Sequence, residues 1–277
     1  MTQKPLYENF KWTFSTLGCS DLTLEESCLL AKKFGLKHIE VRSLEDRVDL
    51  PDYFAGKYGS PENLKSVLDD HGVQISTLNA SLKMVGNTKE DREEFLKFVP
   101  WAEAIDTPLL RAFDGGTPQT ILEGETLEQA VDTLRWWQEL RAKNSWNVKM
   151  AVETHDCLCP LDGYDRIKNE LGKDFTVIWD SHHTWKKSGV PIKDSWEHLK
   201  SSVPTVHLKD SVPVPSARHP FSYTTYGEGT FPLNETLETL KKDGYDGFVC
   251  IEWERKWHPY LAPLDEALQK AKDLNWF

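Results

Sequence analysis

The feature that most constrains the fold is the alternation of short apolar runs with amphipathic stretches along all 277 residues. Runs such as KMAVE (149–153), TVIWD (176–180) and FVCIE (248–252) are apolar on both faces, which is typical of parallel strands covered by helices. This pattern predicts eight strands, at residues 12–16, 38–42, 74–79, 109–113, 149–153, 176–180, 205–209 and 247–252.

Helix start and stop signals separate these strands. Thr23 and Glu26 form a capping box before a helix that ends at Gly35, and Pro61 stands in the first turn of a helix that ends before Gly72. Further helices are predicted at residues 88–105, 126–144, 164–171, 192–200, 232–243 and 263–274. The eight units indicate an α/β fold, a (β/α)8 TIM barrel, with residues 1–277 as a single domain. A doubly wound sheet would need a glycine-rich loop after its first strand, but residues 16–20 contain one glycine.

Net charge and cysteine content indicate which binding partners and which cellular compartment to expect. The chain has 33 Lys and Arg against 44 Asp and Glu, a net charge of −11, which disfavours nucleic acid and anionic membranes as partners. Its five cysteines lack a disulfide-framework spacing, the stretch MTQKPLYENF (1–10) contains no apolar h-region, and no run approaches about 20 apolar residues. We therefore expect a cytoplasmic protein without a membrane segment.

The predicted strand ends carry the chemistry, because active sites of TIM barrels lie at the carboxyl ends of the strands. Four consecutive strands supply Glu153, Asp180, His207 and Glu252. Buried charges are costly unless they are paired or bind a metal, so these side chains predict a divalent-metal site. Three carboxylates and one imidazole suit Mn²⁺, Mg²⁺ or Co²⁺, with Zn²⁺ as a further option. The alternative is a ring of ion pairs with the basic residues Arg42, Arg111, Lys209 and Arg218.

Several motifs together resemble the xylose isomerase-like TIM-barrel superfamily, which contains the sugar phosphate isomerase/epimerase family. They are VETH (152–155), WDSHH (179–183), VHLKD (206–210), IEWE (251–254), YGEG (226–229) and DGYDG (243–247). The resemblance extends over residues 14–263. It implies a metal-dependent sugar isomerase or epimerase of carbohydrate metabolism, which abstracts a proton α to a carbonyl through a metal-stabilised enediolate.

The resemblance also implies roles for individual residues. The metal ligands of the ketose epimerases match Glu153, Asp180, His207 and Glu252, and their acid/base pair matches the two glutamates. His183 matches a histidine that contacts sugar oxygens, with His182 not distinguished from it. Arg218 lies in the loop that supplies a substrate-binding arginine. Other strand-end residues can bind substrate hydroxyls or form ion pairs at the barrel mouth, namely Glu40, Arg111, His155 and Lys209. Trp12, Trp185, Trp253 and Trp257 are predicted to form an apolar wall for a sugar face.

The same candidate site is also compatible with functions other than isomerisation or epimerisation. A second glutamate of the ketose epimerases falls on Cys159, or on Leu158 with a one-residue shift, so a lyase similar to the 2-keto-inositol dehydratases is the main alternative. His155 or Lys209 would then serve as the acid. An apurinic endonuclease-like phosphodiesterase is disfavoured by the acidic charge, and a non-catalytic sugar-binding barrel by the four ligand-type residues. The expected partner is a carbohydrate or polyol, and the family suggests a homo-oligomer.

Overall fold

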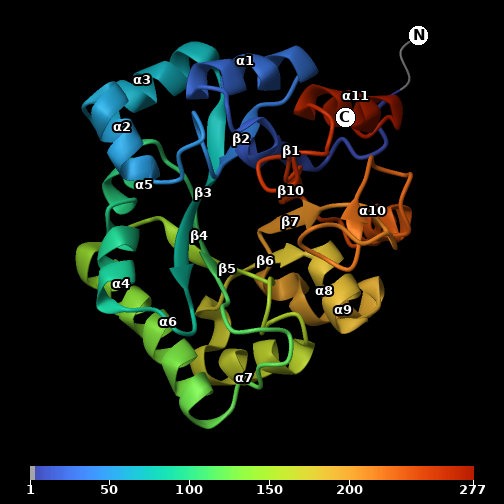
Figure 1. Cartoon of the computed structure of the whole chain (residues 1–277). Coiled ribbons are helices and arrows are strands. Elements are labelled where there is room, and N and C mark those ends of the chain that lie inside the picture. Colours follow the sequence, from blue (N-terminus) through green and yellow to red (C-terminus); the bar gives the residue numbers. More distant parts are fainter. Residues whose placement is uncertain (1–3) are drawn as a thin grey trace.

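The protein folds as the predicted TIM barrel in a computed structural model that describes residues 4–277 (Figure 1). Eight parallel strands lie in the order β1-β10-β7-β6-β5-β4-β3-β2, and a parallel bridge between Ser15 and Glu40 joins the two end strands. The strands are β1 (Lys11–Phe14), β2 (His38–Val41), β3 (Gln74–Lys83), β4 (Leu109–Phe113), β5 (Lys149–Glu153), β6 (Val177–Asp180), β7 (Thr205–Leu208) and β10 (Phe248–Ile251).

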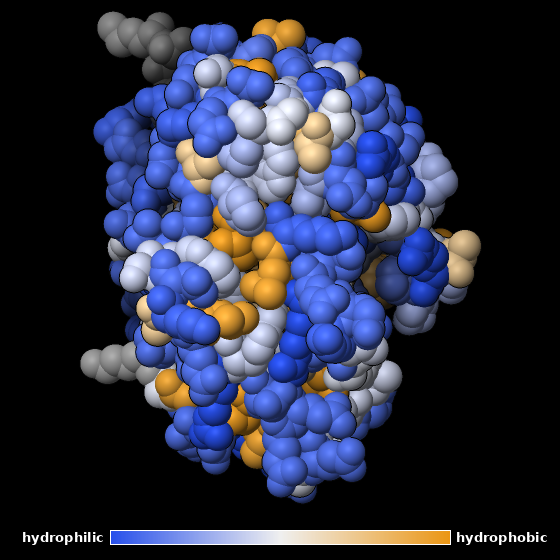
Figure 2. Space-filling view, turned by 90° about the vertical axis from the view of Figure 1, so that its left-hand side faces the viewer, coloured by the Kyte–Doolittle hydropathy of each residue, from blue (hydrophilic) through white to orange (hydrophobic). Residues whose placement is uncertain are grey.

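Helices surround the barrel and cover the outer faces of the strands (Figure 1). They are α1 (Leu24–Phe34), α2 (Leu50–Tyr58), α3 (Pro61–His71), α4 (Lys89–Leu96), α5 (Val99–Ala104), α6 (Gly124–Asn144), α7 (Leu161–Leu171), α8 (Ser181–Ser188), α9 (Ile192–Leu199), α10 (Leu233–Lys242) and α11 (Leu264–Asp273). Short 3-10 turns lie at Thr16–Cys19, Gly172–Asp174 and Lys200–Ser202. Figure 2 shows a mainly hydrophilic outer face, with apolar side chains gathered in narrow strips, as expected for amphipathic helices.

Local chemistry accounts for the helix ends. The Thr23 hydroxyl accepts a hydrogen bond from the backbone N–H of Glu26, whose carboxylate accepts one from the N–H of Thr23, so the predicted capping box is confirmed. Gly35 ends α1 in the left-handed conformation, with φ at 77°. The predicted helix at 88–105 is wrong as one element, because α4 ends at Leu96 and α5 starts anew with Pro100 in its first turn.

Four features of the fold were absent from the prediction. These are the helices α2 and α8, the antiparallel hairpin of β8 (Ser211–Val212) and β9 (Ser222–Tyr223), and the extension of β3 to Lys83. The hairpin lies after β7, and its connecting loop carries Arg218 and His219 to the mouth of the barrel. The extension of β3 places Lys83 at the same mouth.

Two of the recognised motifs form a structural clasp beside the hairpin. The Asp210 carboxylate accepts hydrogen bonds from the backbone N–H groups of Gly227 at 2.9 Å and Gly229 at 3.0 Å. A Cβ atom at position 229 would lie 1.9 Å from an oxygen of Asp210, so this position requires glycine. The aspartate of HLKD and the glycines of YGEG therefore stabilise the loop that follows the hairpin.

The alternation of side chains along each strand decides which residues reach the barrel interior. Leu109, Ala151 and Ile178 pack together inside the barrel as a small apolar cluster. Two residues further along β5 and β6, the same face of each strand presents Glu153 and Asp180. Because every second side chain of a strand points to the same face, the ionisable residues at the strand ends point toward the barrel axis.

Candidate active site

The four predicted metal ligands converge at the carboxyl end of the barrel. One ligand atom from each of Glu153, Asp180, His207 and Glu252 lies within 4.8 Å of all the others. The first two end β5 and β6, His207 lies within β7, and Glu252 follows β10, so neighbouring strands supply them. All four side chains are buried. This arrangement brings three carboxylates and an imidazole to one point.

His207 is held in a defined orientation by a second carboxylate. Its Nε2 lies 3.0 Å from Glu40 Oε2, and its Nδ1 faces Glu252 Oε2 at 2.8 Å and Glu153 Oε1 at 3.5 Å. Asn79 Nδ2 donates to the other oxygen of Glu40 at 2.8 Å. Glu40 is fully buried and does not line the cavity at the mouth, within the part of the chain described. The structure therefore places this predicted substrate-binding residue behind His207, as an orienting partner.

Two basic residues pair with the carboxylates. Lys209 Nζ lies 2.5 Å from Asp180 Oδ2, 2.7 Å from Glu252 Oε2 and 2.7 Å from Glu254 Oε1. Arg111 Nε lies 3.3 Å from Glu153 Oε2. Arg111 and Lys209 therefore form the ion pairs of the alternative interpretation, whereas Arg42 and Arg218 have no carboxylate within ion-pair distance among residues 4–277.

The two glutamates experience different electrostatic environments. Burial disfavours the Glu153 carboxylate, but Arg111 and His207 outweigh it and hold the pKa of Glu153 well below its usual range. Burial raises the pKa of Glu252, and the charge of Glu153 raises it further against the effects of His207 and Lys209. A divalent cation would favour the ionised form of every carboxylate around it.

The hydrogen bonding of the buried ligand atoms is consistent with a site for a divalent cation. Glu153 Oε2, His207 Nδ1 and Glu252 Oε2 are buried, and each has an ion-pair neighbour, but none makes a hydrogen bond of good geometry within residues 4–277. Buried polar atoms normally have such partners. Oxygen ligands with one imidazole suit Mg²⁺, Mn²⁺ or Co²⁺, and also zinc. The four residues that can hold the ion are therefore the same four that the sequence predicted as ligands.

A cavity of about 360 Å³ opens above this group and contains several of the predicted substrate-binding residues. His155, Lys209, Arg111 and Arg218 line it, together with Glu153 and Glu252. His183 lies beside it, with Nδ1 2.9 Å from Asp180 Oδ2, Nε2 3.3 Å from Lys209 Nζ, and its ring against His155.

The structure separates the two histidines that the sequence left equivalent. His182 Nε2 lies 2.8 Å from Ser211 Oγ, and its ring packs among Phe221, Tyr223 and Phe231. Burial lowers the pKa of His182 to about 3, so the ring is neutral. His183 is therefore the histidine that contacts the ligand group, and His182 supports the hairpin.

Some lining residues escaped the sequence reasoning. Lys83, His219 and His258 all line the cavity. Lys83 lies beyond the predicted end of its strand, and His219 lies in the unpredicted hairpin. His258 follows a predicted strand and adjoins Trp257, so its position near a strand end is a signal that the sequence does contain. The prediction that four tryptophans form an apolar wall is wrong for three of them. Within the described residues, only Trp257 of the four lines the cavity. Trp12 instead stacks on Trp276, Trp185 packs on Phe231 and Trp253 on Tyr226.

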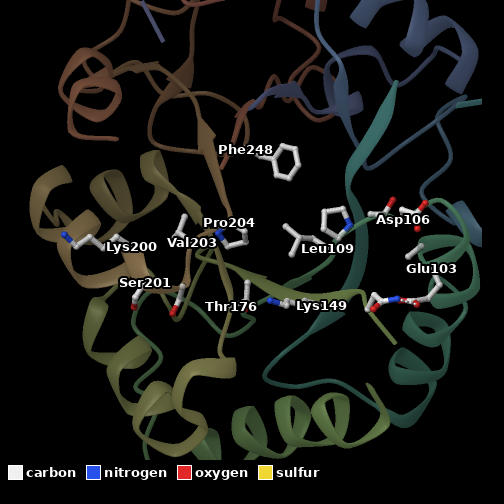
Figure 3. Close-up of a pocket in the computed structure, with 15 residues that line it drawn as sticks. Glu103, Asp106, Leu109, Lys149, Thr176, Lys200, Ser201, Val203, Pro204 and Phe248 are labelled. Carbon is white, nitrogen blue, oxygen red and sulfur yellow. Dashed lines mark hydrogen bonds between the residues drawn. The ribbon is translucent and has the colours of Figure 1, made fainter. Parts of the chain in front are cut away.

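A second cavity, of about 590 Å³, lies at the opposite end of the barrel. Figure 3 shows Leu109, Lys149 and Phe248, the first residues of their strands, around it. Although this cavity is larger, no metal-capable group of the described residues includes any residue that lines it. Because TIM-barrel chemistry takes place at the carboxyl ends of the strands, the smaller cavity is the candidate active site.

Fold and site together define a TIM barrel with a metal-capable acidic centre at its mouth. The family model described as xylose isomerase-like TIM barrel matches residues 28–277, and the chain belongs to this family. An inosose isomerase from Halalkalibacterium halodurans is 26% identical over 266 residues, which cover 91% of each chain.

Solved structures show the same fold at lower identity. A probable 3-DHS dehydratase, AsbF of Bacillus anthracis, superposes with a TM-score of 0.77 at 18% identity, over 96% of this chain and 98% of the other. The IolI protein with a zinc atom has a TM-score of 0.76 at 20% identity, over 95% and 96%. A D-tagatose 3-epimerase-like protein has a TM-score of 0.69 at 19% identity, over 96% of each chain. Within residues 4–277, no helix has both the length and the apolar character to cross a bilayer.

Proposed function

We propose that this protein is a divalent-metal-dependent isomerase or epimerase that moves a proton α to the carbonyl of a sugar or cyclic polyol ketone. The observation that carries the proposal is the convergence of Glu153, Asp180, His207 and Glu252 beside a cavity that the two glutamates line. The inosose isomerase relative supports a polyol ketone as substrate.

A divalent cation held by Glu153, Asp180, His207 and Glu252 would supply Lewis-acid stabilisation of the negative charge that develops when the α proton leaves. Glu153 and Glu252 are the proposed acid/base pair. They reach His207 from strands on its two sides, β5 and β10, so one can take the proton and the other return it to a different position or face. Arg111 and Lys209 hold these carboxylates in place by ion pairs.

The remaining side chains of the cavity bind and orient the substrate. We assign His155 and His183 to its hydroxyl and carbonyl oxygens, with Arg111 and Lys209 as further donors at the floor, and Arg218 to another part of the substrate. Trp257 offers an apolar surface beside Arg218, whose guanidinium lies 5.6 Å from the centre of the Trp257 ring. Positioning of this kind lowers the entropic part of the barrier.

A lyase is the second candidate, because dehydration of a β-hydroxy ketone begins with the same proton abstraction. Lys209 Nζ lies 2.7 Å from Glu252 Oε2, and His155 lies across the same cavity, so each can donate a proton to a departing hydroxide. The similarity to a probable dehydratase supports this alternative at the level of fold.

The test is metal analysis of the purified protein, followed by NMR in D₂O with ketoses and ketoinositols. We expect a bound divalent ion and exchange of a carbon-bound proton, with loss of water from the substrate only if the lyase is correct. Glu252→Gln should slow the exchange ~10²- to 10⁴-fold, the usual contribution of an acid/base group. Glu90→Gln, on the exposed side of α4, is the matched control and should leave the rate unchanged. Tight binding of a sugar without exchange under any metal would instead indicate a non-catalytic barrel, and cleavage of abasic DNA a phosphodiesterase.

A further inference from the structure

The charges at the mouth of the barrel are unevenly distributed. The strands β5, β6, β7 and β10 carry the acidic group, whereas β2, β3 and β4 follow one another on the other side of the ring. That second side presents Arg42, Lys83 and Arg111, and all three line the cavity. The cavity therefore has a metal-capable half and a cationic half.

Arg42 is the informative residue of the cationic half. Its side chain is only 7% exposed, and its Nη1 and Nη2 donate to two neutral acceptors, Asn79 O at 3.2 Å and Ser81 Oγ at 3.0 Å. Within residues 4–277 no carboxylate lies within ion-pair distance of this guanidinium. Burial of a cation without a counter-ion is costly, so an external anion is the natural partner for Arg42.

Glu153 attracts Arg42 electrostatically, but it does not lie within ion-pair distance and is shared with a closer cation. Arg111 lies alongside, with Nη1 donating to Ala80 O at 3.1 Å, the carbonyl next to the one that Arg42 uses. Arg111 is already paired with Glu153 at 3.3 Å. The other acidic residues of the lining are engaged as well, Asp156 with His155 at 2.7 Å and Glu252 and Glu254 with Lys209. Arg42 is therefore the cation of this lining for which no carboxylate remains unpaired among residues 4–277.

Two solvent-exposed cations, Lys83 and Arg218, add further positive charge to the same cavity. Lys83 comes from the extension of β3, and Arg218 comes from the loop of the β8–β9 hairpin. Both line the same cavity as Arg42, and neither has an ion-pair partner among the residues that the structure describes. Exposed cations alone would be ordinary, but around a buried arginine they add to a field that attracts anions.

We propose that Arg42, Lys83 and Arg218 bind an anionic group of the substrate, a carboxylate or a phosphate, at the end opposite its reacting ketone. The proposal rests on the proposed function for the position of that ketone. The planar fork of Arg42 suits both anions, since each can accept two parallel hydrogen bonds from a guanidinium. A neutral polyol would leave the three cations without a counter-ion.

The test is calorimetric titration of the metal-loaded protein with inorganic phosphate and, separately, with acetate. We expect saturable binding of at least one anion, the tighter of the two identifying the group that the substrate carries. Arg42→Gln should weaken this binding ~10- to 100-fold, as expected for hydrogen bonds to a charged group. Lys83→Ala, an exposed substitution that leaves the core intact, should weaken it to a smaller extent and reduce its dependence on salt. The matched control is Lys89→Ala, which removes an exposed lysine outside the cavity.

Two results would overturn the proposal: no saturable binding of either anion to the wild type, or equal binding by the wild type, Arg42→Gln and Lys83→Ala. Anion held only by the metal would give the second result, because it would survive both substitutions. The outcome is separable from that of the proposed reaction. Proton exchange in a neutral ketone without anion binding would refute the anion site alone, whereas anion binding at Arg42 without exchange in any ketone would refute the reaction alone.

Discussion

Removal and return of the metal should change the stability of this protein by a predictable amount. Three buried carboxylates repel one another around His207, with ligand atoms no more than 4.8 Å apart, and a cation that binds there binds the folded chain alone. At a free metal concentration 100 times its dissociation constant, mass action adds about 2.7 kcal/mol to the free energy of unfolding. In a protein of 277 residues that corresponds to a rise in the midpoint of thermal unfolding of about 5 °C.

The measurement is differential scanning calorimetry of chelator-treated protein with and without Mn²⁺, Mg²⁺, Co²⁺ or Zn²⁺. Asp180→Asn should abolish the increment while preserving the start of α8, because the amide oxygen of Asn can still accept the hydrogen bond from the N–H of His183. Asp70→Asn, on the exposed side of α3, is the matched control and should retain the full increment. The reasoning fails if no metal raises the midpoint, or if Asp180→Asn responds as Asp70→Asn does.

Three further predictions concern residues around this centre and a distant helix. Glu40→Gln should weaken metal binding ~10- to 100-fold in a calorimetric titration, because it removes the charge behind His207, and unchanged affinity would contradict the orienting role. Burial raises the pKa of Asp114 to about 7 against the opposing backbone hydrogen bonds. The neutral form is then favoured by folding, so Asp114 contributes stability below about pH 4 that is lost as the pH rises to 7, up to about 4 kcal/mol. Urea unfolding of Asp114→Asn should lack this fall relative to the wild type, and parallel pH profiles would refute it. Thr23→Ala should cost about 1 kcal/mol in the same urea assay through loss of the cap on α1, with no effect on metal binding.

The sequence alone determined the barrel and the four candidate ligands, because both depend on local patterns. A strand buried on both faces has an apolar composition that can be recognised within about five residues, and a charged residue at its end interrupts that run. Glu153, Asp180, His207 and Glu252 are each the interruption of such a run. Once the strands are parallel, the ends must meet at one edge, so their convergence follows from topology without knowledge of any contact.

Only the tertiary structure decided what surrounds these four residues. Glu40 and His207 are 167 positions apart, and closure of the barrel brings them into contact. The same closure joins Arg42, Lys83 and Arg218 in one cavity, although Arg42 follows β2, Lys83 ends the unpredicted extension of β3 and Arg218 lies in the unpredicted hairpin. Trp12 was predicted to face a substrate, but its ring stacks on Trp276 instead. The sequence did not indicate this contact. The physical reason is common to all of them: local patterns report which residues are buried, whereas the neighbour that a buried side chain meets depends on the path of the whole chain.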